Sequence, residues 1–423
     1  MSAAEAPRAH IVGAGLAGLS AAVALAKAGH AVQLSDAAAQ AGGRCRSYHD
    51  PQLGVEIDNG NHLVLSGNRA VMAYLATIGA EDRLDGPDDA RLDFQDVRSG
   101  ESWSITPSAG PIPWWLLARK TRVPGTRLGE YLALARLLRA GPDATIGDTI
   151  RCSGPLWDRL LEPFLVAALN TPPREGSAAL AGAVVRETLA KGGRHCRPRV
   201  ATPTLAAAFV DPALAWLAGR GATVRLGRRL KALETDAGHV TALIFADGRE
   251  PVAPGEPVVL AVPAWIAAAL VPGLAVPDRH HAIVNAHFLM PPPPGARRIV
   301  GVIGGLAEWI FAFPDRLSVT ISAADRLLET DRESLARAIW ADVAAVHALP
   351  PDLPTWQIVR EKRATFSATP AQEKRRGAAA TSFANLFLAG DWTNTGLPAT
   401  IEGAIRSGET AARLAGAAES GIA

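Results

Sequence analysis

A glycine-rich turn near the start of the 423-residue chain constrains the fold more than any other feature. Gly13, Gly15 and Gly18 have the spacing G-x-G-x-x-G, between an apolar stretch at 10–12 and an apolar helical run at Leu16–Ala28. The first glycine permits a tight turn, the second lets the backbone approach a pyrophosphate, and the third lets helix and strand pack closely. The helix N-terminus offers N–H groups and a positive dipole end to the phosphates. The turn therefore predicts a Rossmann-like parallel sheet that binds a dinucleotide.

Two features just downstream extend the predicted nucleotide site. Asp36 follows a second predicted strand, where a carboxylate can accept hydrogen bonds from the adenosine ribose. Gly42, Gly43 and Arg44 come next, and Arg44 can make a bidentate, charge-assisted contact with a pyrophosphate. This second cationic contact is unnecessary for a nicotinamide dinucleotide but suits a longer ligand. We therefore predict FAD as the cofactor.

The C-terminal part of the chain indicates a second half of the same site. Gly390 and Asp391 end an apolar strand at 385–390, and a terminal helix is predicted over Thr400–Leu414. A helix that starts there directs its N–H groups at the electron-rich edge of an isoalloxazine ring and stabilises the reduced anionic form. Asp391 is predicted to accept from ribityl hydroxyls or to lie near the pyrophosphate. The other residues assigned to the cofactor site are Leu16, Ala17, Gly60, Asn61, Leu230, Thr400, Ile401 and Ala404.

Composition excludes several other classes of protein. The 43 Lys and Arg residues nearly balance the 41 Asp and Glu residues, so no nucleic-acid partner is indicated. Cys45, Cys152 and Cys196 are far apart, and we expect neither a disulfide framework nor a metal site. The uncharged segment Val258–Val276 contains Pro263, Pro272 and Gly273, so it predicts a buried strand and a short helix, Ala264–Leu270, rather than a membrane span. Without an evident signal peptide, a cytoplasmic location is expected.

The order of the patterns predicts an α/β fold with a discontinuous FAD-binding domain, in which helices flank a parallel sheet. Its three segments are predicted at 1–100, 201–272 and 381–423. A helical insert at 101–200 belongs to the substrate side, and 273–380 form the rest of a mixed α+β substrate domain.

The fingerprint through Arg44 and the Gly390-Asp391 segment resemble those of the FAD-dependent amine oxidase and phytoene desaturase superfamily. Four internal stretches are similar to the squalene-associated flavoproteins of bacterial hopanoid synthesis, the hydroxysqualene dehydroxylases: 58–62, 169–173, 285–288 and 361–366 with Thr369-Pro370. The resemblance implies reductive removal of the allylic hydroxyl of a C30 isoprenoid lipid to give squalene. Acid-assisted loss of water and hydride transfer from reduced flavin would accomplish it.

Loss of the hydroxyl requires a proton donor, and three residues are candidates. His62 is the first choice, because imidazole titrates near neutrality and the Arg44 segment passes near the isoalloxazine ring. Asp58 and His287 are the other options. The hydrocarbon requires apolar surface, and six residues of the insert either line a tunnel or form the core of the insert: Trp157, Leu160, Leu161, Phe164, Leu165 and Leu169.

The sequence also bears on partners. The stretch Pro113–Leu117, with Trp114 and Trp115, precedes the basic residues Arg119, Lys120 and Arg122. This is typical of a peripheral anchor at the inner face of the bacterial membrane, and equally of a solvated basic segment with buried tryptophans. No second G-x-G-x-x-G is present, which predicts an external electron donor, either a separate reductase or free reduced flavin. Two other functions remain open: an oxidative desaturase of squalene or a carotenoid precursor, and a non-catalytic prenyl-lipid carrier.

Overall fold

A five-stranded parallel sheet lies at the centre of one half of the molecule. The computed structural model describes residues 6–420. The strand order is β10-β2-β1-β14-β20, so strands from the beginning, middle and end of the chain are hydrogen-bonded to one another. The strands are β1 (Arg8–Val12), β2 (Ala31–Ser35), β10 (Thr223–Arg225), β14 (Val258–Leu260) and β20 (Leu386–Leu388). This confirms the predicted discontinuous parallel sheet.

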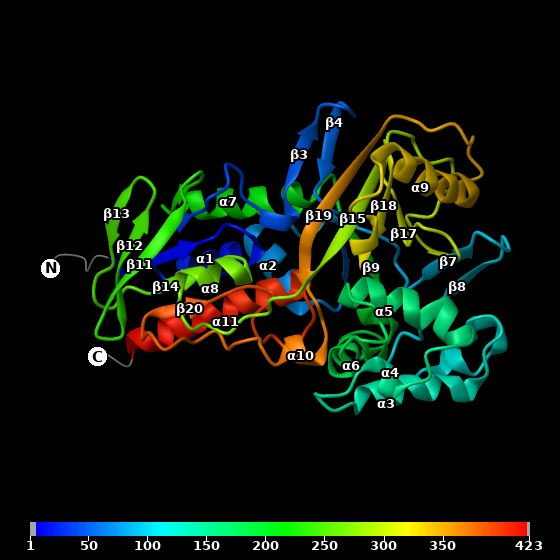
Figure 1. Cartoon of the computed structure of the whole chain (residues 1–423), viewed down its shortest axis with the longest axis horizontal. Coiled ribbons are helices and arrows are strands. Elements are labelled where there is room, and N and C mark those ends of the chain that lie inside the picture. Colours follow the sequence, from blue (N-terminus) through cyan, green and yellow to red (C-terminus); the bar gives the residue numbers. More distant parts are fainter. Residues whose placement is uncertain (1–5, 421–423) are drawn as a thin grey trace.

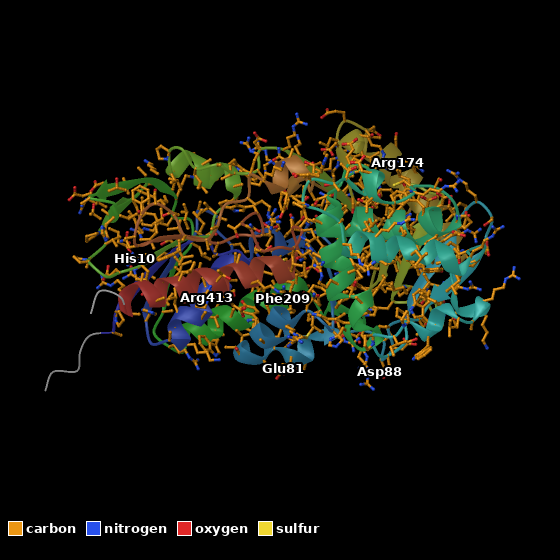
Figure 2. All side chains as sticks on the ribbon, turned by 90° about the horizontal axis from the view of Figure 1, so that it is seen from below. His10, Glu81, Asp88, Arg174, Phe209 and Arg413 are labelled. Atoms are coloured by element: carbon orange, nitrogen blue, oxygen red, sulfur yellow. The ribbon has the colours of Figure 1, made fainter. Side chains whose placement is uncertain are left out.

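Helices cover this sheet, and the two at the ends of the chain pack tightly. In Figure 2, α11 (Ile401–Ser420) lies alongside α1 (Leu16–Lys27). A Cβ atom at Gly408 would lie 2.2 Å from the carbonyl oxygen of Ala17, and the Ser20 hydroxyl donates to the Ile405 carbonyl at 3.0 Å. Such close approach explains why small residues recur in both helices. Two more helices pack nearby: α2 (Arg69–Ile78) and α7 (Asp211–Ala218).

A small antiparallel sheet extends this half of the molecule. It consists of β11 (Leu230–Asp236), β12 (His239–Phe245) and β13 (Gly248–Pro251), with the tight turn predicted at Asp247-Gly248. The uncharged segment forms β14 and α8 (Ala264–Leu270), as predicted. No helix within residues 6–420 combines the length and the apolar character needed to cross a bilayer.

The second half is built on a seven-stranded sheet of order β19-β15-β18-β17-β16-β7-β8. One face is covered by α9 (Arg332–His347), whose Trp340 packs on Phe288. β7 pairs with β16 in this sheet, although residues 92–96 belong to the first FAD-binding segment, 1–100, in the sequence-based prediction. The strands are β7 (Leu92–Asp96), β8 (Ser102–Ile105), β15 (His280–Phe288), β16 (Ile299–Ile303), β17 (Trp309–Ala312), β18 (Leu317–Ile321) and β19 (Trp356–Phe366).

The helical insert forms a lobe at the end of the molecule opposite the chain termini (Figure 1). Five of the six apolar residues considered for a tunnel are buried in its core, and only Phe164 is partly accessible. Its helices are α3 (Leu132–Leu138), α4 (Ile146–Thr149), α5 (Glu162–Leu169) and α6 (Ala178–Glu187). The shorter elements of the fold are β3 (Ser47–Asp50), β4 (Val55–Asp58), β5 (Leu63–Leu65), β6 (Leu84–Asp85), β9 (Pro198–Ala201) and α10 (Pro370–Glu373).

Candidate functional site

The two glycine-rich loops lie directly against each other at the carboxyl end of β1. The Gly42 N–H donates to the Ala14 carbonyl at 2.8 Å, and Gly15 and Gly42 form a parallel backbone bridge. A Cβ atom at Gly18 would lie 1.8 Å from the Gly13 oxygen, so this position tolerates only glycine. At Gly15, by contrast, an added Cβ meets nothing within 4 Å. The backbone around Gly15 therefore leaves open space at the N-terminus of α1.

The open space fits the pyrophosphate of FAD. No side chain caps α1, and its first turn, which contains Leu16 and Ala17, has no acidic residue. The free N–H groups and the positive end of the helix dipole are therefore available to an anion. Gly43, next to this loop, has a left-handed φ of +57° and is exposed. Both loops thus leave backbone accessible where a phosphate could bind, and the individual contacts remain predictions.

Asp36 lies between the first loop and the segment that leads into β11. Its carboxylate oxygens accept from the N–H groups of Ala14 at 2.6 Å and Ala38 at 2.7 Å. Its backbone carbonyl accepts from Arg228 at 2.7 Å, two residues before the buried Leu230. A carboxylate offers about four acceptor positions, so two remain for ribose hydroxyls. Asp36 therefore orders the loop as well as offering a nucleotide contact.

Arg44 connects the N-terminal loops to the loop after β20 and to strand β19. Its guanidinium donates to Asp391 Oδ1 at 2.7 Å and to the Ala364 carbonyl at 2.5 Å. Asp391 is nearly buried, with 7% of its side chain exposed, whereas 43% of the Arg44 side chain is accessible. Arg44 thus keeps free surface beside the proposed phosphate position while it neutralises Asp391.

The loop after β20 is held by a buried arginine that the sequence analysis missed. The Arg376 guanidinium donates to the backbone carbonyls of Asp391 at 3.1 Å and Thr393 at 3.0 Å. It also forms an ion pair with Glu373 at 2.7 Å. Nothing in the local sequence distinguishes this arginine from its neighbours, because its partners come from a loop that approaches only in the folded chain.

The start of α11 lies beside this loop, as predicted, one residue later than the sequence indicated. Thr400 Oγ1 accepts from the Gly403 N–H at 3.0 Å and so caps the helix, while Ile401 is buried and Ala404 is partly buried. The Gly390 N–H donates to Ser407 Oγ at 2.8 Å, which fixes β20 against α11. The helix N-terminus is therefore available to the cofactor, but the Thr400 hydroxyl already has an internal role.

The four internal stretches that carry the family resemblance are linked by contacts along β15 and β19 of the seven-stranded sheet. Asn59 Nδ2 contacts Glu361 at 3.3 Å, and the Asn61 N–H lies 3.4 Å from Asn285 Oδ1. An added Cβ at the buried Gly60 would lie 3.1 Å from Asn285 Nδ2, so this loop packs directly on β15. These contacts join the first, third and fourth stretches.

The second stretch is joined to the fourth by the residue that ends α5. Asn170 adopts a left-handed φ of +45°, which asparagine tolerates better than most residues. Its amide donates to Thr365 Oγ1 at 2.9 Å and accepts from the Ala323 N–H at 2.7 Å. The sequence assigns Asn170, Asn285 and Glu361 no individual role, and their position in the four stretches is the one signal that points to them.

The three candidate proton donors have different surroundings. His62 is partly buried, and burial together with the Arg44 charge lowers its pKa to about 4. This corrects the expectation that it titrates near neutrality. Asp58 is buried and accepts from Ser47 Oγ at 2.6 Å and the Leu205 N–H at 2.9 Å, and burial raises its pKa.

His287 is completely buried in β15, and its Nδ1 lies 2.9 Å from Ser318 Oγ. Burial lowers its pKa to about 3, so the ring is neutral at physiological pH. Both Asp58 and His287 are enclosed by internal packing, which is typical of structural polar groups. Of the three candidates, His62 therefore retains the best access to a bound molecule.

Comparison with known proteins agrees with this geometry. The family model for flavin-containing amine oxidoreductases matches residues 16–415. Hydroxysqualene dehydroxylase from Zymomonas mobilis is 52% identical over 96% of this chain and 98% of its own length. The protein of that name from Rhodopseudomonas palustris is 54% identical over 96% and 97%.

Solved structures support the fold. Cyclohexylamine oxidase from Brevibacterium oxydans aligns with a TM-score of 0.72 at 15% identity, covering 99% of this chain and 100% of its own. Putrescine oxidase aligns with a TM-score of 0.64 at 16% identity, covering 97% and 98%. The family model and these relatives identify an FAD-dependent oxidoreductase rather than a non-catalytic lipid carrier. The chain belongs to the flavin-containing amine oxidoreductases and, among them, to the hydroxysqualene dehydroxylase family.

Proposed function

We propose that this enzyme reductively removes the allylic hydroxyl group of hydroxysqualene and releases squalene. The proposal rests on the 52% and 54% identity, over 96% of the chain, with relatives named hydroxysqualene dehydroxylase. In the overall reaction a C–O bond breaks, a C–H bond forms, and the hydroxyl leaves as water, which consumes two electrons and two protons. Reduced FAD supplies the two electrons when it is bound.

The residues that link the four stretches would position the substrate. Hydroxysqualene has one polar group, so most of its affinity comes from burying hydrocarbon, at roughly 25 cal/mol per Å². Phe164 supports this role, because it is the member of the predicted apolar set that keeps accessible surface. The polar contacts of Asn61 and Asn285 would then orient the hydroxyl end.

His62 is the group that we propose contacts the leaving oxygen. Within the part of the chain that the structure describes, its ring nitrogens make no hydrogen bond, so both are available. A neutral imidazole has one N–H donor, which can hydrogen-bond to the hydroxyl as it leaves. Burial is the larger cause of the low pKa of His62 and the Arg44 charge is the second, and a pyrophosphate bound to Arg44 would offset that second cause. Removing that part of the shift would raise the pKa of His62 and favour proton donation.

A single-turnover experiment tests this function. The holoenzyme is reduced without oxygen, mixed with hydroxysqualene, and followed by flavin absorbance and by analysis of the extracted lipid. We expect the oxidised flavin spectrum to return as squalene forms in equal amount. Desaturated products from oxidised enzyme and squalene, with no reaction of the reduced enzyme, would instead establish the oxidative desaturase.

The electron donor and the location complete the proposal. An external reductase or free reduced flavin is expected to supply the electrons, because the sequence contains a single G-x-G-x-x-G turn. NADPH oxidation by the pure enzyme without a reductase would contradict this. A peripheral position at the inner face of the bacterial membrane would suit a lipid substrate.

A further inference from the structure

The insert has a concentration of exposed apolar side chains. Seven large apolar residues are exposed in the part of the chain that the structure describes, and five of them lie within 112–132. We call these five the insert patch: Ile112 (54% exposed), Trp114 (62%), Leu117 (64%), Leu128 (47%) and Leu132 (63%). Exposing this much apolar surface in one short segment costs free energy in water, which indicates that something covers it.

The patch is held by an ordered support. The ring of Trp115 is buried and packs edge-on against Tyr131, with centroids 5.6 Å apart. The Tyr131 hydroxyl accepts from the backbone N–H of Val123 at 3.0 Å. The backbone N–H of Trp115 donates to Ser108 Oγ at 2.9 Å. These contacts tie 112–117 to 128–132, so the two exposed segments belong to one surface region. Adjacent tryptophans thus have opposite roles, one in the support and one in the patch.

The charges around the patch have one dominant sign. The exposed cations between and beside its two segments are Arg119, Lys120, Arg127, Arg136 and Arg139. Across residues 6–420, none of these five side chains takes part in an ion pair. The acidic residue of the segment, Glu130, accepts from the backbone N–H of Arg127 at 2.9 Å and is thereby occupied as a helix cap. The five cations outnumber this carboxylate, so the region presents apolar side chains among an excess of positive charge.

We infer that the insert patch docks on a bilayer that contains anionic lipid. Trp and Leu side chains partition into the lipid interface, and each nearby Lys or Arg is attracted to the negative headgroups. A protein partner would require acidic groups to match all five cations, and a second copy of this chain would place like charges opposite each other. An anionic membrane satisfies both features of the surface.

The position of the patch suits this role. The insert lies at one end of the molecule (Figure 1), and its helix α5 ends at Asn170, which contacts Thr365 in the candidate site. A lipid-soluble substrate would then enter through the part of the enzyme that touches the membrane. Substrate entry from the membrane rests on the proposed function. Binding of the protein to a membrane does not depend on it and can be measured without the reaction.

Vesicle co-sedimentation of the purified holoenzyme tests the inference. Vesicles of phosphatidylcholine mixed with an equal amount of phosphatidylglycerol are compared with vesicles of phosphatidylcholine alone. We expect binding to the anionic vesicles, weakened by salt, and roughly tenfold weaker binding when Trp114→Ser, Leu117→Ser and Leu132→Ser are combined. The Ile266→Ser variant, exposed by 39% on α8, is the matched control and should bind like the wild type.

A charge-reversal pair provides an independent measurement. Arg119→Glu with Lys120→Glu should weaken binding to anionic vesicles, whereas Arg337→Glu on the exposed side of α9 should not. Melting temperature and flavin absorbance verify that each variant is folded. Equal binding by the triple variant, or equal binding to both kinds of vesicle, would overturn the inference. Light scattering that shows a dimer abolished by the triple variant would assign the patch to a second copy instead.

Discussion

The Arg44 guanidinium and the Asp391 carboxylate, 347 residues apart in the sequence, lie 2.7 Å apart in the fold. The pair joins the loop after β2 to the loop after β20, and the second donor contact of Arg44 reaches Ala364 in β19. One side chain thereby connects the nucleotide-binding sheet at both of its chain ends with the substrate-side sheet.

Replacing Arg44 is expected to affect both cofactor and fold. Arg44→Ala leaves the nearly buried Asp391 without its cationic partner, which should lower the free energy of unfolding of the apoprotein by about 1–2 kcal/mol. FAD affinity should fall about tenfold or more, since a charge-assisted contact is lost. Arg44→Lys should recover only part of both effects, because one ammonium cannot reproduce the planar fork. Denaturation curves measure the free energy of unfolding and titration with FAD measures the affinity, with Arg337→Ala as a surface control.

The glycines of the first loop should respond differently to alanine. Gly15→Ala has space for its Cβ and a φ of −72° that alanine accepts, so the protein should fold normally but retain much less FAD. Gly18→Ala forces its Cβ to 1.8 Å from a backbone oxygen and should cost more than about 3 kcal/mol in stability. Flavin content and melting temperature separate the two outcomes, and Gly129→Ala is a neutral control. Wild-type flavin content in Gly15→Ala would contradict the assignment of the open space to a phosphate.

His62 provides a test of the proton-donor proposal. We expect His62→Ala to reduce turnover at least about tenfold while FAD stays bound, because the leaving oxygen loses its donor. In the apoprotein the pKa of His62 is lowered to about 4, so an NMR titration should show a neutral ring at neutral pH. Addition of FAD should move that pKa upwards. Full activity of the alanine variant would remove His62 from the mechanism.

Glu308 predicts a specific pH dependence of stability. Burial raises its pKa from 4.5 to about 7, and its carboxyl group accepts from the Ser322 N–H at 2.7 Å. The folded state therefore holds this proton more tightly than the unfolded state. The stabilisation is complete below about pH 4.5 and is lost as the pH rises through about 7, by up to about 3 kcal/mol.

The Glu308→Gln variant keeps a neutral acceptor at this position. It should therefore lose less stability than the wild type between about pH 5 and about pH 8. Urea denaturation at both pH values measures the difference, with Glu333→Gln at the exposed start of α9 as the control. Parallel pH profiles for wild type and Glu308→Gln would show that this carboxyl group has no raised pKa.

Much of the nucleotide-binding half could be predicted because its signals are local. The G-x-G-x-x-G turn, the apolar run after it and the strand before it are neighbours in sequence, and each requires a particular backbone geometry. The short helix Ala264–Leu270 was predictable for the same reason, since Pro263 favours a helix start and Pro272 opposes continuation. The catalytic candidates could not be ranked in this way, because burial sets the pKa values of His62 and His287.

The amino-acid sequence by itself determined the dinucleotide turn, the FAD cofactor and the family, because these depend on residue identity at fixed spacing. Only the tertiary structure decided that β7 joins β16, that Trp115 is buried while Trp114 is exposed, and that four distant stretches are linked by contacts such as Asn61 with Asn285 and Asn170 with Thr365. Strand pairing and burial depend on contacts between residues far apart in the chain, and such contacts exist only after the chain has folded.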